Sequence, residues 1–222
     1  MRRAWIGASL VAVLLVFGQS AIGEESVNAE PQLTPAPHTI EGFRSARFGS
    51  TEDEVRDAIK RDFGSVELET ATSEAERTTY LFFRDVTLAP DTPPATVFFI
   101  FGYKTKRLIQ VNVIWGEANG LPVSELYPFS KTLATYFSRL GSFVDGSVVI
   151  EQRQADGSIT AFQARDAKGA MISLRVLPYV DPAETSKLDK AERIRVDQIV
   201  LRLSYVENPD TPDIFYIEQG LF

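Results

Sequence analysis

The chain of 222 residues contains no cysteine and only one histidine, His38. The absence of cysteine excludes a disulfide, a thiolate metal ligand, a cysteine nucleophile and the acylated cysteine of a lipoprotein signal. The lone histidine lies in a polar, proline-bearing stretch, which is a poor setting for a Ser-His-Asp arrangement or a zinc site. We therefore assign no catalytic residue, no metal ligand and no cofactor.

Phosphate-binding signals are also missing. The sequence has no G-x-x-x-x-G-K-[ST] motif and no dinucleotide fingerprint. Basic residues are in the minority, with 23 Lys and Arg against 30 Asp and Glu and a net charge of −7. Such an acidic surface repels phosphate backbones. We therefore expect no nucleic-acid partner.

The N-terminus has the order of a secretory signal peptide. Two arginines after Met1 are followed by an apolar run over 4–17 and a small-residue site that ends at Gly23. The run is shorter than the roughly 20 residues of a spanning helix, so we expect cleavage after Gly23 or after Ala29 rather than an uncleaved anchor. Cleavage after Gly23 would remove two basic residues and no acidic one, which takes the net charge from −7 to −9. The mature protein is predicted to be exported from a bacterial cell, periplasmic or extracellular, and not transmembrane.

Three regions are expected along the chain. Residues 1–23 form the signal peptide, residues 24–39 a flexible tether without apolar periodicity, and residues 40–222 a single α+β domain. The alternative for the domain is two pseudo-repeats, over 40–116 and 117–222. Stability must come from packing, since no disulfide is available.

Two helices are predicted. Thr51 and Glu54 form a capping box for the first helix, which Gly64 ends, and its buried stripe consists of Val55, Ala58 and Ile59. The second helix follows from apolar residues at helical spacing before Gly141, namely Leu126, Phe129, Leu133, Phe137 and Leu140.

Strands are indicated by branched and aromatic residues between turn signals. The expected strands cover residues 66–68, 79–88, 148–154, 159–164, 171–177 and 199–205. Residues 70–77 fit a loop or a short helix, and the charged stretch 181–193 fits a recognition loop or a solvated connection. The tail after Glu207 is expected to pack back on the domain. The fold class is α+β, with two main helices packed on antiparallel sheet.

The most apolar run outside the N-terminus, residues 95–116, predicts a β-hairpin. A one-residue slip turns a whole face over, and a loop of even length would set its phenylalanines opposite Gln110 and Asn112. We therefore predict a three-residue loop of Lys104, Thr105 and Lys106. Tyr103 then faces Arg107, and the opposed pairs are Phe101 with Ile109, Phe99 with Val111, and Val97 with Val113.

This register gives the hairpin two faces. The apolar face is assigned to the core and carries Val97, Phe99, Phe101, Ile109, Val111, Val113 and Trp115. The second face is half polar and carries Thr96, Phe98, Ile100, Leu108, Gln110, Asn112 and Ile114. Apolar residues on both sides of a strand are typical of two buried sides, so a helix covering the second face is one interpretation and a binding surface is the other.

The order of elements, a helix and then about four strands, occurs twice and suggests a tandem α-β4 pseudo-repeat. Residues 49–55 (GSTEDEV) and 120–126 (GLPVSEL) share a glycine, a glutamate five positions later and an aliphatic residue six positions later, at an offset of 71 residues.

The first of these segments resembles the G-x-T-x-x-[EQ]-V helix start of small exported α-β modules, the BamE/SmpA-like proteins and the tandem β-lactamase inhibitor protein. The resemblance covers this helix start and the order of elements. It departs from the family at Lys60, where a glycine is common, and in the missing lipobox. It implies an envelope binding or assembly module that presents a surface, without catalytic residues.

Two functions are therefore considered. The first is a non-enzymatic envelope module that holds a protein or a lipid-like ligand on the face of Phe98, Ile100, Gln110 and Asn112. The second is a carboxylate-dependent hydrolase of an envelope polymer, with Asp85, Glu117 and Glu151 as candidate acids near strand ends.

Overall fold

The computed structural model describes residues 36–118, 120–180 and 194–217. These residues form helices α1 (Glu52–Phe63) and α2 (Val123–Ser138) and one large antiparallel sheet. The long strands of the sheet are β3 (Glu69–Thr72), β4 (Thr79–Val86), β5 (Ala95–Phe101), β6 (Leu108–Trp115), β8 (Val149–Arg153), β9 (Ile159–Arg165), β10 (Met171–Val180) and β11 (Ile194–Val206). The short strand β7 (Leu121–Pro122) pairs with β11, and β1 (Gly42–Phe43) and β2 (Ala46–Arg47) form a separate ribbon. The α+β class is confirmed, with more strand than helix.

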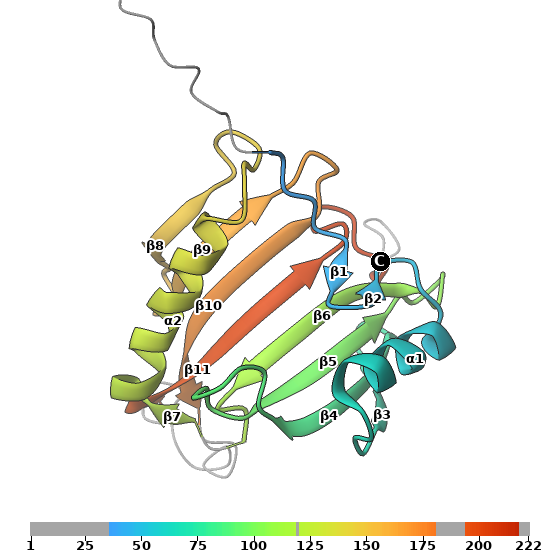
Figure 1. The fold of residues 1–222 in the computed structure, drawn as a ribbon, viewed down its shortest axis with the longest axis horizontal. Helices are drawn as coiled ribbons and strands as arrows, with labels where there is room; N and C mark the ends of the chain where they lie inside the picture. The colour runs from blue at the N-terminus through green and yellow to red at the C-terminus, as the bar shows by residue number, and fades with distance from the viewer. Residues whose placement is uncertain (1–35, 119, 181–193, 218–222) are drawn as a thin grey trace, which may run out of the picture. The chain divides into compact units, whose positions relative to one another are not determined.

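The sheet is built from two groups of four strands. Its spatial order is β3-β4-β5-β6-β11-β10-β9-β8, and every neighbouring pair is antiparallel (Figure 1). Helix α1 precedes β3 to β6, and α2 precedes β8 to β11. The two groups meet at the β6–β11 pair in the middle of the sheet. This is the element order expected from the sequence, apart from the short strands β1, β2 and β7.

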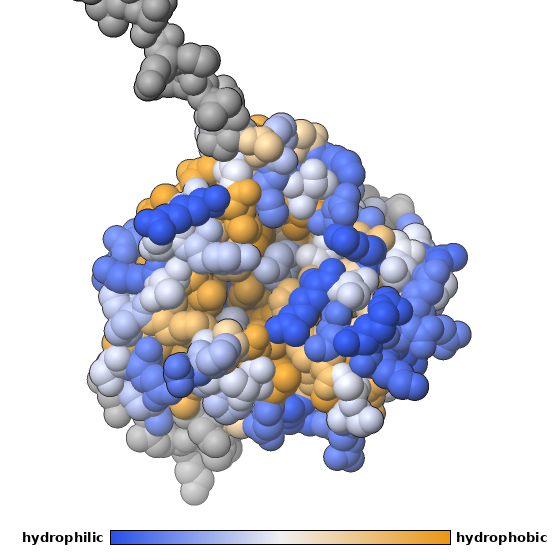
Figure 2. Space-filling model, in the orientation of Figure 1, coloured by the Kyte–Doolittle hydropathy of each residue, from blue (hydrophilic) through white to orange (hydrophobic). Residues whose placement is uncertain are grey.

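Both helices lie on the same face of the sheet (Figure 1). The ring of Phe63 at the end of α1 packs 4.9 Å from Phe83 of β4. On α2, Phe129 packs 5.2 Å from the indole of Trp115, and Phe137 packs on β9. Figure 2 views the molecule from this side and shows apolar groups between the helices and charged groups over α1. The main core therefore lies between the helices and this face of the sheet.

Helix α1 begins where the capping box predicts. The Oγ1 atom of Thr51 accepts a hydrogen bond from the N–H of Glu54, and the Glu54 carboxylate accepts one from the N–H of Thr51 at 2.7 Å. That backbone hydrogen bond holds the pKa of Glu54 below its usual value. The helix ends at Gly64, whose φ of 70° favours glycine. The predicted stripe of Val55, Ala58 and Ile59 is buried.

The register of the β5–β6 hairpin is confirmed along most of its length, with Val97 opposite Val113 and Phe99 opposite Val111. The predicted loop is wrong. Gly102, not Tyr103, pairs with Arg107, so the loop has four residues, 103–106.

A β-bulge at Ile109 restores the parity that the even loop would have reversed, because it adds one residue to β6. Phe101 consequently lies opposite Leu108 and not Ile109. Leu108 is part of the core cluster, whereas the carbonyl of Ile109 accepts a hydrogen bond from the N–H of Glu207. The assignment of Leu108 to the second face is therefore wrong, whereas Ile109 is buried as predicted, at 8% exposure, but lies outside that core cluster.

The edge of the sheet next to β4 also differs from the prediction. No strand forms over 66–68, where Val66 and Leu68 pack against the core from an irregular segment. Strand β3 lies instead at 69–72 and overlaps the start of 70–77, the stretch expected to form a loop or a short helix. Its sequence, ETAT, is mostly exposed and gives no apolar alternation, so its pairing with β4 decides its structure.

The described part of the C-terminal tail packs on the domain, as predicted. The carboxylate of Asp213 accepts hydrogen bonds from the N–H groups of Lys104 and Thr105 in the hairpin loop, at 2.9 Å and 2.8 Å. Farther along, the ring of Phe215 packs 5.6 Å from the ring of Tyr103. The tail therefore fixes the conformation of the four-residue loop.

Several predictions lie outside the described residues, namely the signal peptide over 1–23, the first part of the tether and the charged stretch 181–193. The end of the tether is described. The N–H of His38 donates to the carbonyl of Ser142, and its ring meets Phe143 at 5.3 Å. None of the helices in the described ranges is both long enough and apolar enough to cross a membrane.

Candidate functional site

The structure brings the four predicted binding residues together on the face of the sheet opposite the helices. Phe98 on β5 lies opposite Asn112 on β6, and Ile100 lies opposite Gln110. All four side chains are half-buried, and the Gln110 amide donates to Asn112 Oδ1 at 2.9 Å. The residues between them in sequence, such as Phe99, point into the core under the helices. Within the described residues, no helix lies on this second face (Figure 1).

We call this surface the open face. Its central part is formed by the side chains of five neighbouring strands, β4, β5, β6, β11 and β10, and we define it by Tyr80, Phe82, Phe98, Ile100, Gln110, Asn112, Ile114, Ser173, Arg175, Arg202 and Ser204.

The open face has an aromatic end. Phe82 on β4 stacks on Phe98 with ring centroids 5.2 Å apart, and Tyr80 packs 5.9 Å from each of these two rings. Phe82 is only 6% exposed, because the guanidinium of Arg84 lies 4.5 Å above its ring and is itself ion-paired with Glu69. The sequence predicted the strand that carries Tyr80 and Phe82 but not its position beside Phe98.

The other end of the open face is polar. Arg202 on β11 lies directly opposite Arg175 on β10. Arg175 donates to Asp156 at 3.2 Å and to the Ser158 hydroxyl at 2.6 Å. Arg202 has no hydrogen-bond or ion-pair partner among the described residues, and its Nε is buried. Burial lowers the pKa of Arg202, and the charge of Arg175 lowers it further. No sequence pattern had singled out either arginine.

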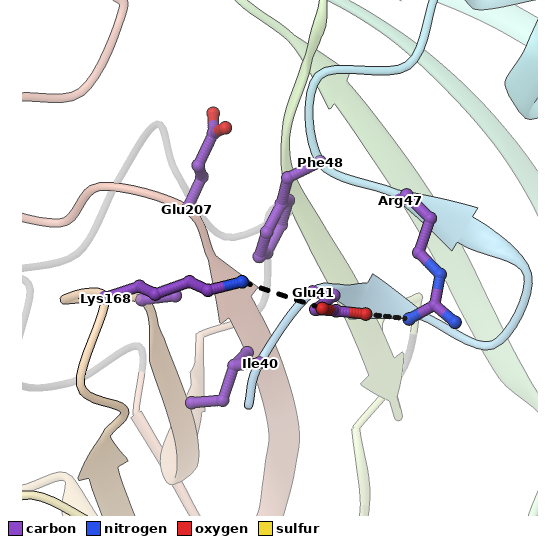
Figure 3. A pocket seen from close by; sticks show the side chains of 7 residues that line it. Ile40, Glu41, Arg47, Phe48, Lys168 and Glu207 are labelled. Atoms are coloured by element: carbon purple, nitrogen blue, oxygen red, sulfur yellow. Dashed lines mark hydrogen bonds and ion pairs between the residues drawn. The ribbon is translucent and has the colours of Figure 1, made fainter. Parts of the chain in front are cut away.

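Outside the open face, a pocket of about 510 Å³ lies near the end of β11, beside the β1–β2 ribbon (Figure 3). Its charges are mostly paired with one another, because the Glu41 carboxylate lies 3.0 Å from Arg47 and 3.7 Å from the Lys168 ammonium. The Glu207 carboxylate points away from that cluster (Figure 3). Burial, with a smaller contribution from Asp213, raises the pKa of Glu207. The pocket therefore offers no unpaired charge at its centre.

The three candidate acids of the hydrolase hypothesis do not form one site. Glu151 lies on the edge strand β8 and pairs with Lys131 at 3.1 Å, while five strands separate β8 from the β4 strand of Asp85. At about 4.8 Å per strand this is a separation of roughly 29 Å, far beyond the roughly 5–9.5 Å of a glycosidase pair. Glu117 is exposed in the loop after β6.

Metal binding finds no support in the described ranges. Across 36–118, 120–180 and 194–217, no three His, Asp or Glu side chains lie close enough together to hold an ion.

The fold belongs to the α+β class, with both described helices on one face of a large antiparallel sheet. The open face combines apolar and polar side chains on the other side of that sheet. The chain matches no protein family, no curated protein and no solved structure. Inferences about its function therefore rest on the residues of the open face.

Proposed function

We propose that the chain is an exported, non-enzymatic binding or assembly module of the bacterial cell envelope that engages its partner through the open face. The observation that carries this proposal is the placement of both helices on one side of the sheet. Phe98 and Ile100 therefore lie on the side without a helix, next to amide and guanidinium groups. Half-buried apolar side chains among hydrogen-bonding groups are typical of interface surfaces.

The size of the face favours a protein over a lipid-like ligand. The five strands of the open face, at about 4.8 Å spacing and each about 20 Å long, span roughly 480 Å², more than half of what a partner covers in a standard interface. One partner in a standard protein–protein interface buries about 800 Å². A single lipid chain would cover only a fraction of this surface.

The element order supports a tandem α-β4 pseudo-repeat as the origin of the sheet. Gly49 and Gly120, which match at the offset of 71 residues, both have positive φ, 78° and 66°, at the start of a helix. The second copy lacks the capping box, since Pro122 stands where the first copy has Thr51. In this proposal the two halves meet at β6 and β11, and the open face spans both.

A matched pair of variants on β5 tests the proposed function. In Phe98→Ser/Ile100→Ser, two open-face side chains are removed, and in Phe99→Ser, one core side chain between them is removed. We expect the Tm of the double variant to fall by at most about 6 °C and that of Phe99→Ser by at least about 10 °C.

The same variants are then crosslinked in the native envelope. At an equal amount of folded protein, the yield of crosslinked partner should be at least tenfold lower for the double variant than for the unchanged chain. If its Tm instead falls as far as that of Phe99→Ser, the open face is buried in the folded protein and is not a binding surface.

A further inference from the structure

Arg202 lies at the polar end of the open face. It lies on β11, in the middle of the sheet, between Leu201 and Leu203, whose side chains are buried in the core. Because side chains alternate along a strand, Arg202 points to the opposite face. Its neighbours across the ladder are Ile114 on β6 and Arg175 on β10.

This position is electrostatically unfavourable for the isolated chain. Two like charges directly opposite on adjacent strands repel each other. Of the two arginines, only Arg175 has its charge offset by an ion pair among the described residues, the one with Asp156. The Nε atoms of both Arg175 and Arg202 are buried without an acceptor. A half-buried guanidinium without an acceptor lowers stability, since its lost hydration is not replaced.

Other groups with unused hydrogen-bonding capacity lie next to Arg202. Ser204 follows it by two residues on the same face and lies opposite both Asn112 on β6 and Ser173 on β10. The hydroxyls of Ser173 and Ser204 and the amide nitrogen of Asn112 have no hydrogen-bond partner in the described part of the chain. Ser204 lies about 7 Å from Arg202 along the strand, and Asn112 and Ser173 are diagonal neighbours of Arg202 at about 7–8 Å, with apolar Phe98 and Ile114 beside them.

We propose that Arg202 binds a carboxylate of a protein partner, from an Asp or Glu side chain flanked by apolar residues that pack on Phe98 and Ile114. This inference rests on the proposed function of the open face and adds the chemistry of the ligand. The planar guanidinium pairs with a carboxylate through two hydrogen bonds. One guanidinium without a counter-charge matches one carboxylate. A membrane or nucleic acid, with many phosphates, would be repelled by a chain of net charge −7.

The test is an NMR titration of the chain without residues 1–23, followed through the backbone amides of Asn112 and Ser204. The probes are the peptide acetyl-Leu-Glu-Leu-amide, its neutral counterpart acetyl-Leu-Gln-Leu-amide, and methyl phosphate. We expect the glutamate peptide to bind at least tenfold more tightly than the glutamine peptide and methyl phosphate. Arg202→Met should abolish the difference between the two peptides. Arg202→Lys should restore only part of it, because an ammonium lacks the planar fork.

Arg56→Met is the matched control, since Arg56 is an arginine of α1 that is ion-paired with Glu52, and this variant should bind like the unchanged chain. The Tm of Arg202→Met should equal or exceed that of the unchanged chain; a lower Tm rescued by Arg202→Lys would assign Arg202 a structural role instead.

Equal binding of the two peptides, or tighter binding of methyl phosphate, would overturn the carboxylate assignment. The proposed function would survive that result if partner crosslinking remained sensitive to Phe98→Ser/Ile100→Ser, so the two failures are distinguishable.

Discussion

Asp166 joins the first described residues of the domain to the β9–β10 turn. It is 2% exposed, and its carboxylate accepts the N–H groups of Ile40 at 2.8 Å, Lys168 at 2.9 Å and Ala170 at 3.0 Å. Asp166→Ala would leave the buried N–H groups of Ile40 and Ala170 without this acceptor, so we expect the free energy of unfolding in urea to fall by about 3 kcal/mol.

Asp145→Ala, which removes an exposed loop carboxylate, serves as the control for Asp166→Ala and should change stability by less than about 0.5 kcal/mol. Hydrogen exchange at the Ile40 amide should accelerate only in the Asp166 variant. Unchanged protection of that amide would contradict the assigned role.

Asp213 and Glu207 are predicted to give opposite pH dependences. Burial raises the pKa of Asp213, but its hydrogen bonds from Thr105 and Lys104 outweigh burial, and the net shift is downward. Its stabilisation is therefore complete above the unfolded pKa of about 4 and is lost as the pH falls through the lower folded pKa. The pKa of Glu207 is raised by burial, so its contribution is lost as the pH rises from about 4 through its folded pKa.

The measurement is urea unfolding between pH 2.5 and 8, chosen to bracket both of these groups. Asp213→Asn should be less stable than the unchanged chain by a constant amount at neutral pH, and this difference in the free energy of unfolding should shrink in acid. Glu207→Gln should gain stability relative to the unchanged chain only as the pH rises above about 4. Parallel curves for the two variants would contradict these assignments.

At the scale of elements, the β5–β6 loop and the C-terminal tail are predicted to be energetically coupled. A Cβ at Gly102 would collide with the Asp213 carboxylate and lie 2.7 Å from Thr105 Oγ1. Gly102→Ala should therefore cost about 1–3 kcal/mol. Much of this cost should vanish in an Asp213→Ala background, with a coupling of at least about 1 kcal/mol in the double-mutant cycle. Additive stability costs of the two substitutions would show that the C-terminal tail does not determine the conformation of the β5–β6 loop.

The same loop shows where prediction from sequence succeeds and where it stops. The capping box at Thr51 and the pairing of Phe99 with Val111 depend on residues close in sequence, and both are confirmed. The four-residue loop depends on Asp213, more than 100 positions away, so no local pattern could indicate it. The order of strands is also non-local, which is why Phe82 was not foreseen beside Phe98, nor Arg202 beside Ile114, on the open face.

At the scale of the whole molecule, export makes a direct prediction about the mature N-terminus. If residues 1–23 are a signal peptide, the chain purified from the envelope should begin at Glu24, or at Glu30 after the second candidate site. Intact mass and N-terminal sequencing of the envelope fraction decide between them. A chain that retains Met1 in the envelope fraction would contradict cleavage, and one that retains Met1 and is found only in the cytosol would contradict the export on which the proposed function depends.

The central claim is that the open face, and not the helix-bearing face, contacts the partner. A photocrosslinking phenylalanine analogue is placed at Phe98, or at Tyr136, which is 57% exposed on α2 on the other side of the sheet. After irradiation of living cells, the account predicts one discrete protein adduct from position 98, with a crosslinked peptide that contains Asp or Glu near the contact, and no adduct from position 136. Adducts of equal yield from both positions, or an adduct from position 136 alone, would contradict it.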